Sequence, residues 1–462
     1  MQRNKVIYSM LILCFFIVGI RHFFSYAESD SVDYESIDAQ IAEDVKKYHI
    51  PGMAIMVVDK DDILFSNTYG NCRDIDTPFI IGSMSKSFTA VAIMQLVEDG
   101  KINLDDSISE YINAAEWFVQ DSDCKKITVR NLLNHTSGIT TYQMFGKLEV
   151  TDSYGQHVYA NANYGLLGLI IESVSGKSYE EYITENIFEP LGMEHSAATL
   201  EKSKADGLID GYRNYFGIPI AGEPDYPQDI SIGTWTNVPA GYLSSSAYDM
   251  GKYLQMYLND GNDIVGEGSI NSMFYDSISV DDDAYFYGMG WQYSTKMFSQ
   301  PVIWHAGLVE NYTSNMFILP EKGIGIVVLV NMNDYLVGNN LLGNVVLPLM
   351  GEEKNIFPVN MYMFLHLVID LICLLICIVA LYPLMTIKKW KNKKGVSYVV
   401  DIVRHLILPV VLLCVPIFLS TPVRVIWLFA KDVCIVLYAN AALLMAVGVY
   451  KFVYRLISNS RK

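Results

Sequence analysis

Three serines and one lysine stand within five residues at the head of "FIIGSMSKSFTAVAIMQLVEDG", which runs from Phe79 to Gly100. The rest of the segment is mostly apolar with helical spacing, and it ends at a glycine, a usual helix terminator. Positions i and i+3 of a helix share a face, so Ser83 and Lys86 are expected to point the same way. A buried lysine can take the proton of a serine because burial disfavours its charged form. The pair indicates covalent catalysis, and the alternative is a solvated lysine beside a capping serine.

Two further stretches add polar groups with matching chemistry. "YAN" (Tyr159–Asn161) precedes a predicted helix, and "HAG" (His305–Gly307) lies on a predicted strand. A tyrosine hydroxyl can move protons to and from a serine, and an asparagine amide can hold a substrate carbonyl. Each motif alone is weak evidence for catalysis. A single tyrosine is usually a packing residue, and a single histidine is usually a surface or core residue with its hydrogen bonds satisfied. Their order and separation together favour one acyl-transfer site.

The elements that must position these residues can be predicted from periodicity. Two strands with a polar turn are expected at Gly52–Gly70, helices at Asn163–Gly176 and Ser178–Gly192, and further strands within 302–331. Strands at both ends of this region and helices between them predict an α/β fold. We expect one mainly antiparallel sheet, flanked by helices and interrupted by a helical insertion.

Charge and hydropathy divide the 462 residues into three regions. Residues 28–354 hold 18 Lys and Arg against 47 Asp and Glu, a formal net charge of −29. Such an acidic region is unsuited to nucleic acid, which needs a basic surface. A small-molecule or peptide substrate fits it better, and residues 28–354 are predicted to form the hydrolytic domain.

Residues 1–27 have the pattern of a secretory signal peptide. A basic start at Arg3 and Lys5 precedes the apolar run Val6–Ile20 and the small-residue cleavage pattern "SYA" at Ser25–Ala27. Arg21 close to that pattern leaves an uncleaved anchor as the alternative. Either interpretation exports the domain that follows.

Residues 355–462 contain three segments long enough to cross a bilayer, at about 361–387, 398–420 and 425–454. The lysine-rich loop "KKWKNKK" and the basic C-terminus are expected in the cytoplasm by the positive-inside rule. A multi-pass protein of the cell membrane with an extracytoplasmic hydrolytic domain is therefore predicted. Three groups of polar residues fall inside the spans: His366 and Asp370, Asp401 and Arg404, and Lys431 and Asp432. They are expected to pair with residues of other helices or to snorkel.

Cysteines and metal-ligand patterns restrict the chemistry further. Of seven cysteines, only Cys72 and Cys124 lie in residues 28–354, and their spacing does not show whether they form a disulfide. The sequence holds no zinc-like cluster of cysteines or histidines, and we expect no metal or other cofactor.

Taken in order, these motifs resemble the serine beta-lactamase and penicillin-binding-protein superfamily, in its class C or S12 peptidase branch. The resemblance runs from about Ile41 to Asn331 and includes several more motifs. These are "LVEDGKINLDDSISEYI", "ITVRNLLNHTSGI", "IFEPLGM", "PAGYLSSSAYDMGKYL" and "YGMGW". It implies a beta-lactamase-like fold.

The resemblance also implies catalytic roles for three residues. Ser83 would be the acylated nucleophile and Lys86 the base beside it. Tyr159 would share the proton transfers, giving a proton to the leaving group and later activating water.

Substrate-binding roles follow in the same way. Asn161 would bind a substrate amide, and the backbone N–H groups of Ser83 and Leu308 would form the oxyanion hole. His305, in the H-x-G motif that ends at Gly307, stands where class C beta-lactamases carry lysine, which favours peptidase, amidase or esterase relatives.

The membrane region makes the chain similar in plan to the membrane peptidases that mature nonribosomal prodrugs. The colibactin-maturation peptidase, which removes an N-acyl-D-asparagine cap, is one of them. Asn311 stands where that relative places a polar substrate contact, whereas Asn161 replaces a serine. The sequence thus predicts a membrane-bound serine hydrolase that cleaves an amide or peptide bond through an acyl-enzyme, with N-acyl-D-amino-acid prodrugs and other acylated molecules as candidate substrates. The alternatives are an esterase, a D-Ala-peptide hydrolase, a weak beta-lactamase, or a penicillin-acylated membrane sensor.

Overall fold

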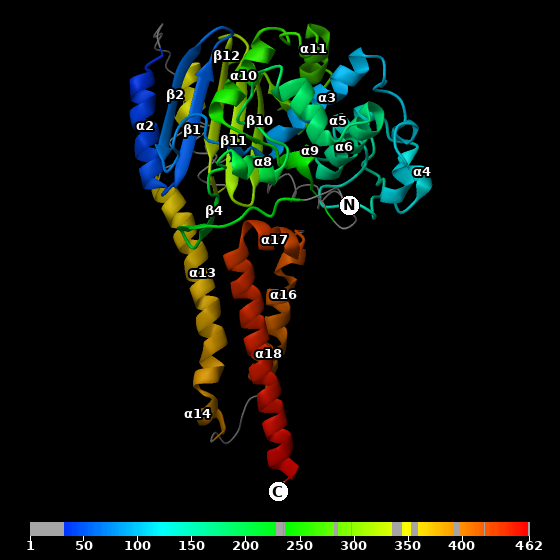
Figure 1. Ribbon diagram of the computed structural model, residues 1–462. Helices are drawn as coiled ribbons and strands as arrows, with labels where there is room; N and C mark the ends of the chain where they lie inside the picture. Colours follow the sequence, from blue (N-terminus) through cyan, green and yellow to red (C-terminus); the bar gives the residue numbers. More distant parts are fainter. Residues whose placement is uncertain are drawn as a thin grey trace. The chain divides into compact units, whose positions relative to one another are not determined.

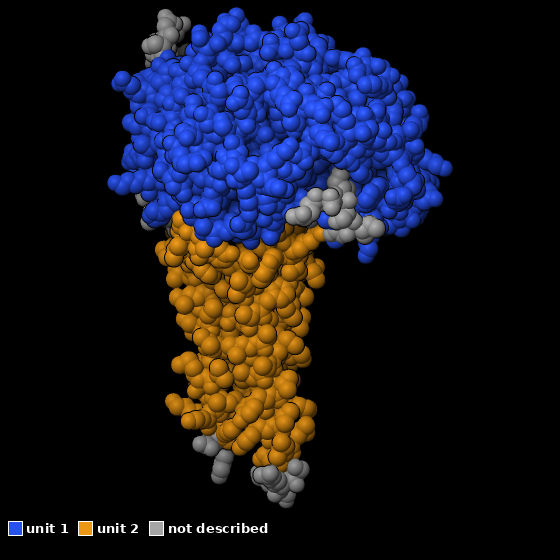
Figure 2. All heavy atoms as spheres, viewed as in Figure 1, with its two compact units in different colours: residues 1–213, 221–357 blue, residues 214–220, 358–462 orange. Residues whose placement is uncertain are grey.

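The computed structural model of the chain describes residues 32–227, 234, 236–280, 285–296, 298–334, 344–352, 359–391, 398–419 and 421–460. The predicted signal peptide, residues 1–27, lies outside the described residues. Figure 2 colours the two compact units of the chain. The first consists of residues Met1–Arg213 and Ala221–Phe357, and the second of Asn214–Ile220 and Pro358–Lys462.

An eight-stranded sheet forms the centre of the first unit (Figure 1). Its order is β2-β1-β12-β11-β10-β9-β8-β7, and neighbouring strands run antiparallel. The strands are β1 (Gly52–Val58), β2 (Ile63–Gly70), β7 (Ile278–Val280), β8 (Tyr285–Tyr287), β9 (Gln292–Ser294), β10 (Val302–Val309), β11 (Tyr312–Leu319) and β12 (Ile324–Val330). Because β1 pairs with β12, the predicted sheet built from both ends of this region is confirmed.

Two smaller sheets accompany the large one. The first joins β13 (Met332–Asn333), β4 (Tyr212–Tyr215) and β5 (Ile218–Ala221), and the second pairs β3 (Phe79–Ile80) with β6 (Ser244–Ser245). The β3–β6 pair leads directly into the segment that carries Ser83.

Helices flank the large sheet, as the sequence predicts. They are α2 (Tyr34–Lys47), α3 (Ser85–Glu98), α4 (Asp121–Cys124), α5 (Val129–Leu133), α6 (Asn161–Ser175), α7 (Tyr179–Ile183), α8 (Leu200–Ala205), α9 (Val238–Gly241), α10 (Ala247–Leu258) and α11 (Glu267–Tyr275). Short 3₁₀ turns occupy Gly82–Met84 (η1), Ile108–Glu110 (η2) and Ala114–Trp117 (η3), and a π-helical turn occupies Thr184–Phe188 (η4). Helix α10 packs on β1 and β12, while α3, α6 and α9 pack together as the helical region beside the sheet (Figure 1).

Burial explains which segments became strands and helices. Strands β1 and β12 are buried at every residue, which fits their continuous apolar sequences, whereas the edge strand β2 is partly exposed. Helix α3 is buried around almost its whole circumference, as a core helix with apolar residues on all sides should be. The ring of Phe88 on α3 stacks on Tyr253 of α10, with 3.8 Å between the ring centroids.

The start of the helix that follows Ser83 differs slightly from the prediction. We expected the helix from Ser83, but α3 begins at Ser85 and Ser83 lies in the 3₁₀ turn η1. A tight turn of this kind is common at a helix N-terminus. The other end is as predicted, since the helix ends at Glu98 and Gly100 adopts a positive φ of 67°.

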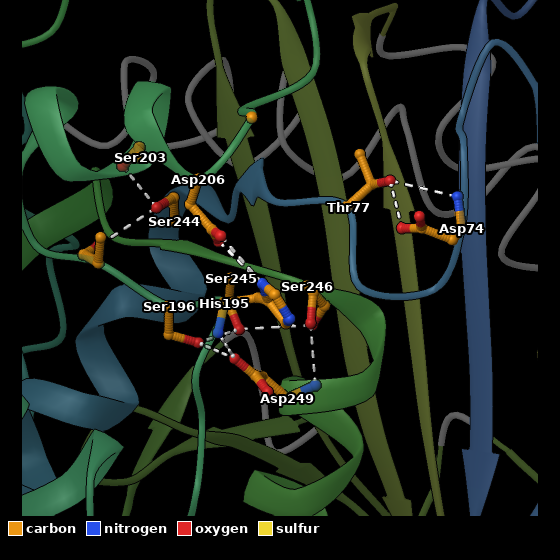
Figure 3. A network of polar contacts seen from close by, with 12 residues as sticks. Asp74, Thr77, His195, Ser196, Ser203, Asp206, Ser244, Ser245, Ser246 and Asp249 are labelled. Carbon is orange, nitrogen blue, oxygen red and sulfur yellow. Dashed lines mark hydrogen bonds and ion pairs between the residues drawn. The ribbon is translucent and has the colours of Figure 1, made fainter.

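A polar network supports the strand that leads to Ser83 (Figure 3). The buried carboxylate of Asp249 accepts hydrogen bonds from the His195 backbone N–H (2.7 Å) and the Ser196 hydroxyl (2.8 Å). The Ser196 hydroxyl lies 2.8 Å from that of Ser245 on β6. Because β6 pairs with β3, which ends three residues before Ser83, the network fixes the start of the turn that carries Ser83.

Cys72 and Cys124, the two cysteines of residues 28–354, do not form a disulfide. Both Cys72 and Cys124 are buried, free thiols. Each donates to a backbone carbonyl, Cys72 to Asp74 (3.4 Å) and Cys124 to Asp121 (3.0 Å). The disulfide that their number would allow is therefore not formed.

The second unit is helical. Its helices are α13 (Val359–Met385), α14 (Ile387–Lys391), α15 (Tyr398–Ile402), η5 (Val403–Ile407, a π-helical turn), α16 (Leu408–Phe418), α17 (Val423–Phe429) and α18 (Lys431–Ser460). Three stretches are long and apolar enough to cross a membrane: His366–Met385, Tyr398–Phe418 and Lys431–Ser458. The third begins later than the predicted residue 425, because the backbone of Ala430 (φ −144°) separates α17 from α18.

A charged cluster joins two helices of this unit. The Asp401 carboxylate of α15 accepts hydrogen bonds from Lys451 Nζ (3.0 Å) and an Arg455 guanidinium nitrogen (2.6 Å), both on α18. The Arg404 guanidinium instead lies over the ring of Tyr382, 5.4 Å from its centroid. Pairing between helices is thus observed, with partners on α18 rather than the neighbouring Arg404.

Candidate active site

Ser83 is held at the point where the large sheet meets α3. A Cβ on Gly82, which has a φ of 56°, would lie 2.5 Å from the backbone nitrogen of Leu308 on β10. On the other side, the backbone N–H of Ile81 donates to the Leu243 carbonyl (2.9 Å). The turn that carries Ser83 therefore lies so close to β10 that only glycine fits at position 82.

Lys86 lies one turn into this segment and is fully buried. Its Nζ is 3.0 Å from Ser83 Oγ, 2.9 Å from Asn161 Oδ1 and 2.5 Å from the Ala240 carbonyl oxygen. Among the described residues, no acidic side chain pairs with it. Burial lowers the pKa of Lys86 well below its ordinary value, because the charged form would lose its hydration without gaining a counter-ion.

The three partners of Lys86 fit a neutral amine. A carbonyl oxygen and an amide oxygen can only accept, so they use the two N–H bonds of a neutral amine. The third partner, the Ser83 hydroxyl, can donate. The nitrogen lone pair is then left facing the serine proton, which is the geometry that a general base requires.

Tyr159 completes the group around Ser83. It precedes α6, and its ring centroid is 4.8 Å from Lys86 Nζ. Burial raises the pKa of Tyr159, and the Ser83 side chain acts in the opposite direction. The phenol thus keeps its proton at neutral pH and can donate it to another group. Asn161, two residues later, begins α6 and binds Lys86 as described above.

His305 lies near this group as a neutral imidazole. Its ring centroid is 6.5 Å from that of Tyr159, and its Nδ1 is 2.7 Å from the Ala306 carbonyl oxygen. A carbonyl cannot donate, so Nδ1 carries the proton and Nε2 accepts from the Tyr287 hydroxyl at 3.2 Å. Burial, together with the nearby Lys86, lowers the pKa of His305 to about 3.

The part of β10 that follows His305 lies against the turn that carries Ser83. Strand β9 pairs with β10 only from Val302 to Trp304, and the remainder of β10 packs against η1. A Cβ on Gly307 would lie 2.1 Å from the Ile81 carbonyl oxygen, so this approach requires glycine. The arrangement places Leu308 N next to Gly82, beside Ser83.

Asn311 has a different environment from the other predicted residues. It is fully buried in the turn between β10 and β11, and its Nδ2 donates to the Gly222 carbonyl at 2.7 Å. A Cβ on Gly211 would lie 2.8 Å from the same Nδ2. Within the described part of the chain, its side-chain hydrogen bond goes to Gly222 and not to the group around Ser83.

Sequence reasoning assigned no role to three further participants. The Ala240 carbonyl binds Lys86, the Tyr287 hydroxyl binds His305, and the His135 ring lies 4.4 Å from that of Tyr159. All three belong to motifs on which the resemblance rests, "PAGY", "YGMGW" and "HTSG". The sequence therefore marked these positions but indicated no function for them. No group of three or more metal-ligating side chains occurs among the described residues.

A serine in a turn before a helix, with a buried lysine and a half-buried tyrosine beside it and an antiparallel sheet next to the turn, is the arrangement found in serine hydrolases of the beta-lactamase fold. The chain belongs to the Beta-lactamase family, whose model matches residues 37–341. Protein flp of Staphylococcus aureus (strain NCTC 8325 / PS 47) is 29% identical over 329 residues, covering 65% of this chain and 63% of its own length. The chain thus spans somewhat less than two thirds of that relative.

Solved structures agree on the fold. The octameric penicillin-binding protein homologue from Pyrococcus abyssi is 29% identical, with a TM-score of 0.62 over 70% of this chain and 80% of its own. A class C beta-lactamase (20% identity, TM-score 0.58) matches over 70% of this chain and 98% of its own. A D-stereospecific amidohydrolase from Streptomyces sp. (21%, 0.54) matches over 65% and 96%. The last two likenesses show the fold alone.

Proposed function

We propose that this protein is a membrane-bound serine hydrolase that cleaves an amide bond through an acyl-enzyme. The observation that carries the proposal is the environment of Lys86, a buried lysine with two obligate acceptors and the Ser83 hydroxyl at 3.0 Å. A neutral amine in that position is a base for serine.

In the first half of the proposed reaction, Ser83 Oγ attacks the substrate carbonyl carbon and its proton passes to Lys86 Nζ. The backbone N–H groups of Ser83 and Leu308 would stabilise the oxyanion, and Asn161 would hold a neighbouring substrate amide. The C–N bond then breaks, and Tyr159 donates its proton to the departing amine. Lys86 returns its proton to Tyr159, which leaves the acyl group on Ser83.

In the second half, a water molecule replaces the amine. Tyr159 passes its proton to the neutral amine of Lys86 as it takes one from the water, and the resulting hydroxide attacks the ester carbonyl. Ser83 leaves as the alkoxide and takes up the proton held by Lys86. The products are a carboxylic acid and an amine, and no other reactant is required.

The neutral state of His305 supports a peptidase or amidase over a beta-lactamase. A class C beta-lactamase carries a lysine there, whereas His305 has its proton on Nδ1 and accepts from Tyr287 at Nε2. A substrate carboxylate would find no cation at this position. The proposed substrates are therefore amides that are neutral next to the scissile bond, including N-acyl-D-amino-acid prodrugs.

The test combines labelling with a substrate panel. A fluorophosphonate should phosphonylate Ser83 in the full chain, or a penicillin-type probe should acylate it, and Ser83→Ala should abolish both labelling and turnover. N-acyl-D-amino-acid amides, matching esters, D-Ala-D-Ala peptides and a cephalosporin then separate the candidate activities. Label on another residue, or turnover by Ser83→Ala, would refute the proposal, and labelling without turnover would favour the sensor.

We further propose that the three candidate spans hold the hydrolytic domain at the outer face of a cell membrane. The basic loop at 388–394 and the basic C-terminus would both be cytoplasmic. A C-terminal reporter that works only in the cytoplasm should be active in this protein. Activity of an exclusively extracytoplasmic reporter at the same position would contradict the topology.

A further inference from the structure

We infer that His135 is a positioning residue for Tyr159, acting through a hydrogen bond from its Nδ1 to the turn that carries this tyrosine. The inference rests on the proposed catalytic role of Tyr159. His135 follows α5 and its exposed fraction is 0%. It takes no part in the reaction steps derived above.

The backbone of His135 already binds the segment before α6. Its carbonyl accepts the Val158 N–H at 2.9 Å, and its φ of 57° lies in the left-handed region, where histidine is found more often than most residues other than glycine. Nearby, the Tyr164 hydroxyl donates to the Leu133 carbonyl at 2.9 Å. The segment from Val158 to Tyr164, with Tyr159 inside it, is thus attached to the end of α5 at both ends.

The side chain adds the contact that acts on Tyr159 itself. His135 Nδ1 accepts the backbone N–H of Ala160 at 3.3 Å and lies 3.0 Å from Asn163 Nδ2. Ala160 stands between Tyr159 and Asn161. A bond to its N–H therefore fixes the peptide that sets the direction of both side chains.

The surrounding hydrogen bonds define the tautomer of His135. Ser137 Oγ accepts from the Ile139 N–H at 3.2 Å and donates to Asn163 Oδ1 at 2.7 Å, which turns the Asn163 amide nitrogen toward His135. Nδ1 then faces two N–H donors and must be unprotonated, so the proton is on Nε2. Only the neutral imidazole can make both contacts.

The ring also packs against the catalytic phenol. The centroids of His135 and Tyr159 are 4.4 Å apart, and Tyr287, Tyr164 and His157 lie at 4.8, 5.2 and 5.9 Å. Burial lowers the pKa of His135 well below its ordinary value, and Lys86, His157 and His305 act in the same direction. The ring is therefore kept neutral by its surroundings, as the Nδ1 contacts require.

Two isosteric substitutions separate the acceptor from the ring. His135→Asn and His135→Leu both remove the ring, but only asparagine keeps an acceptor where Nδ1 stands, and it tolerates a positive φ. In the full chain, turnover of an N-acyl-D-amino-acid amide is measured over a range of substrate concentrations. We expect His135→Leu to lower the maximal rate roughly tenfold, the effect of leaving a buried donor unsatisfied, with little change in the half-saturating concentration. His135→Asn should recover most of the loss.

The Tyr159→Phe background gives the decisive comparison. If His135 acts through the Tyr159 hydroxyl, His135→Leu should cost at most about twofold once that hydroxyl is gone. His157→Gln is the matched control, because it alters a second buried imidazole beside His135 and should lose much less than His135→Leu. Thermal unfolding of each variant confirms folding, and His135→Gly, which accepts the positive φ, replaces leucine if that variant does not fold.

The outcomes are distinct. Equal losses from His135→Leu with and without the Tyr159 hydroxyl, or no advantage of asparagine over leucine, would overturn the inference and leave His135 as packing. Absence of Ser83 labelling in the unaltered protein, or a Tyr159→Phe variant of full activity, would instead overturn the proposed function and the inference with it.

Discussion

Two buried lysines in this protein have opposite environments. Lys86 in the hydrolytic unit is surrounded by a hydroxyl, an amide oxygen and a backbone carbonyl. Lys451 in the helical unit is also buried, but its Nζ lies 3.0 Å from the Asp401 carboxylate and 3.0 Å from His405 Nε2. One lysine has only neutral partners and the other has a counter-ion.

The difference shows how burial can serve either chemistry or assembly. A buried ammonium without a counter-ion is costly, so Lys86 is driven toward the neutral amine that a serine nucleophile needs. A buried lysine with a carboxylate partner instead forms an ion pair that ties two helices together. The presence of one carboxylate decides between these two outcomes.

The largest expected effect comes from removing the base at Lys86. Lys86→Met should lower the rate of Ser83 acylation roughly 10²–10⁴-fold, the usual scale for a general base. Lys86→Arg should lose as much, because a guanidinium keeps its proton at any accessible pH. Rates of fluorophosphonate labelling measure both. An arginine variant with near-normal labelling would mean that a cation, and not a base, is what the site requires.

The next prediction gives Lys86 a carboxylate partner, as Lys451 has. Asn161→Asp places a carboxylate at the atom that now lies 2.9 Å from Lys86 Nζ. A neighbouring opposite charge raises a lysine pKa by roughly 1–3 units, so acylation at neutral pH should fall roughly 10–10³-fold and recover as the pH rises.

Asn161→Leu is the control for the lost amide of Asn161. It should lower the rate without moving the pH profile. A profile for Asn161→Asp that coincides with the unaltered protein would show that Lys86 does not determine it.

The ion pair of the helical unit can be broken in the same way. Asp401→Leu leaves Lys451 and Arg455 without their carboxylate, and removal of one partner of a buried pair costs about 3–5 kcal/mol. Unfolding of the detergent-solubilised chain should occur at lower temperature, while Ser83 labelling in the folded protein stays near normal. Adding Lys451→Met should restore part of the stability. Unchanged unfolding of Asp401→Leu would show that the pair does not stabilise the bundle.

A smaller effect is expected from the buried histidines. Burial lowers the pKa of His157 from about 6.5 to about 4, and that of His305 to about 3. Below pH 6.5 these histidines bind protons in the unfolded chain but stay unprotonated in the folded protein. Stability should therefore be fully present above pH 6.5 and fall on acidification, by about 1.4 kcal/mol per unit for each histidine.

Between pH 6.5 and 5 most carboxylates do not change their protonation, so this range isolates the contribution of the histidines. Denaturant unfolding at several pH values measures the slope, and His157→Gln should make it shallower. An equal slope in that variant would mean that His157 is not protonated on unfolding in this range.

Much of the fold could be predicted because its signals are local. The apolar runs on either side of Asp59–Asp62 became β1 and β2, and the apolar segment after Ser83 became α3. The spacing of Ser83 and Lys86 also brought these two side chains together. Periodicity contains this information because strand and helix geometry repeat over a few residues.

The partners supplied by distant segments could not be predicted. Ala240 lies 154 residues after Lys86, and its carbonyl has no sequence signature. Asp401 was grouped with Arg404 by proximity, yet it binds Lys451, 50 residues away on another helix. The Gly222 carbonyl that accepts from Asn311 Nδ2 lies 89 residues earlier in the chain, and it too has no sequence signature. In each case tertiary packing selects the partner, and single-sequence patterns do not record it.

The central claim is that Lys86 is neutral at physiological pH and accepts the proton of Ser83. Its most direct test is the rate of Ser83 labelling by a fluorophosphonate from pH 5 to pH 11 in the full chain. The account predicts a rate that rises on the acid side and is level from neutral pH upward, because the base is already deprotonated there. A rate that keeps rising to about pH 10.4, where an ordinary lysine loses its proton, would contradict it.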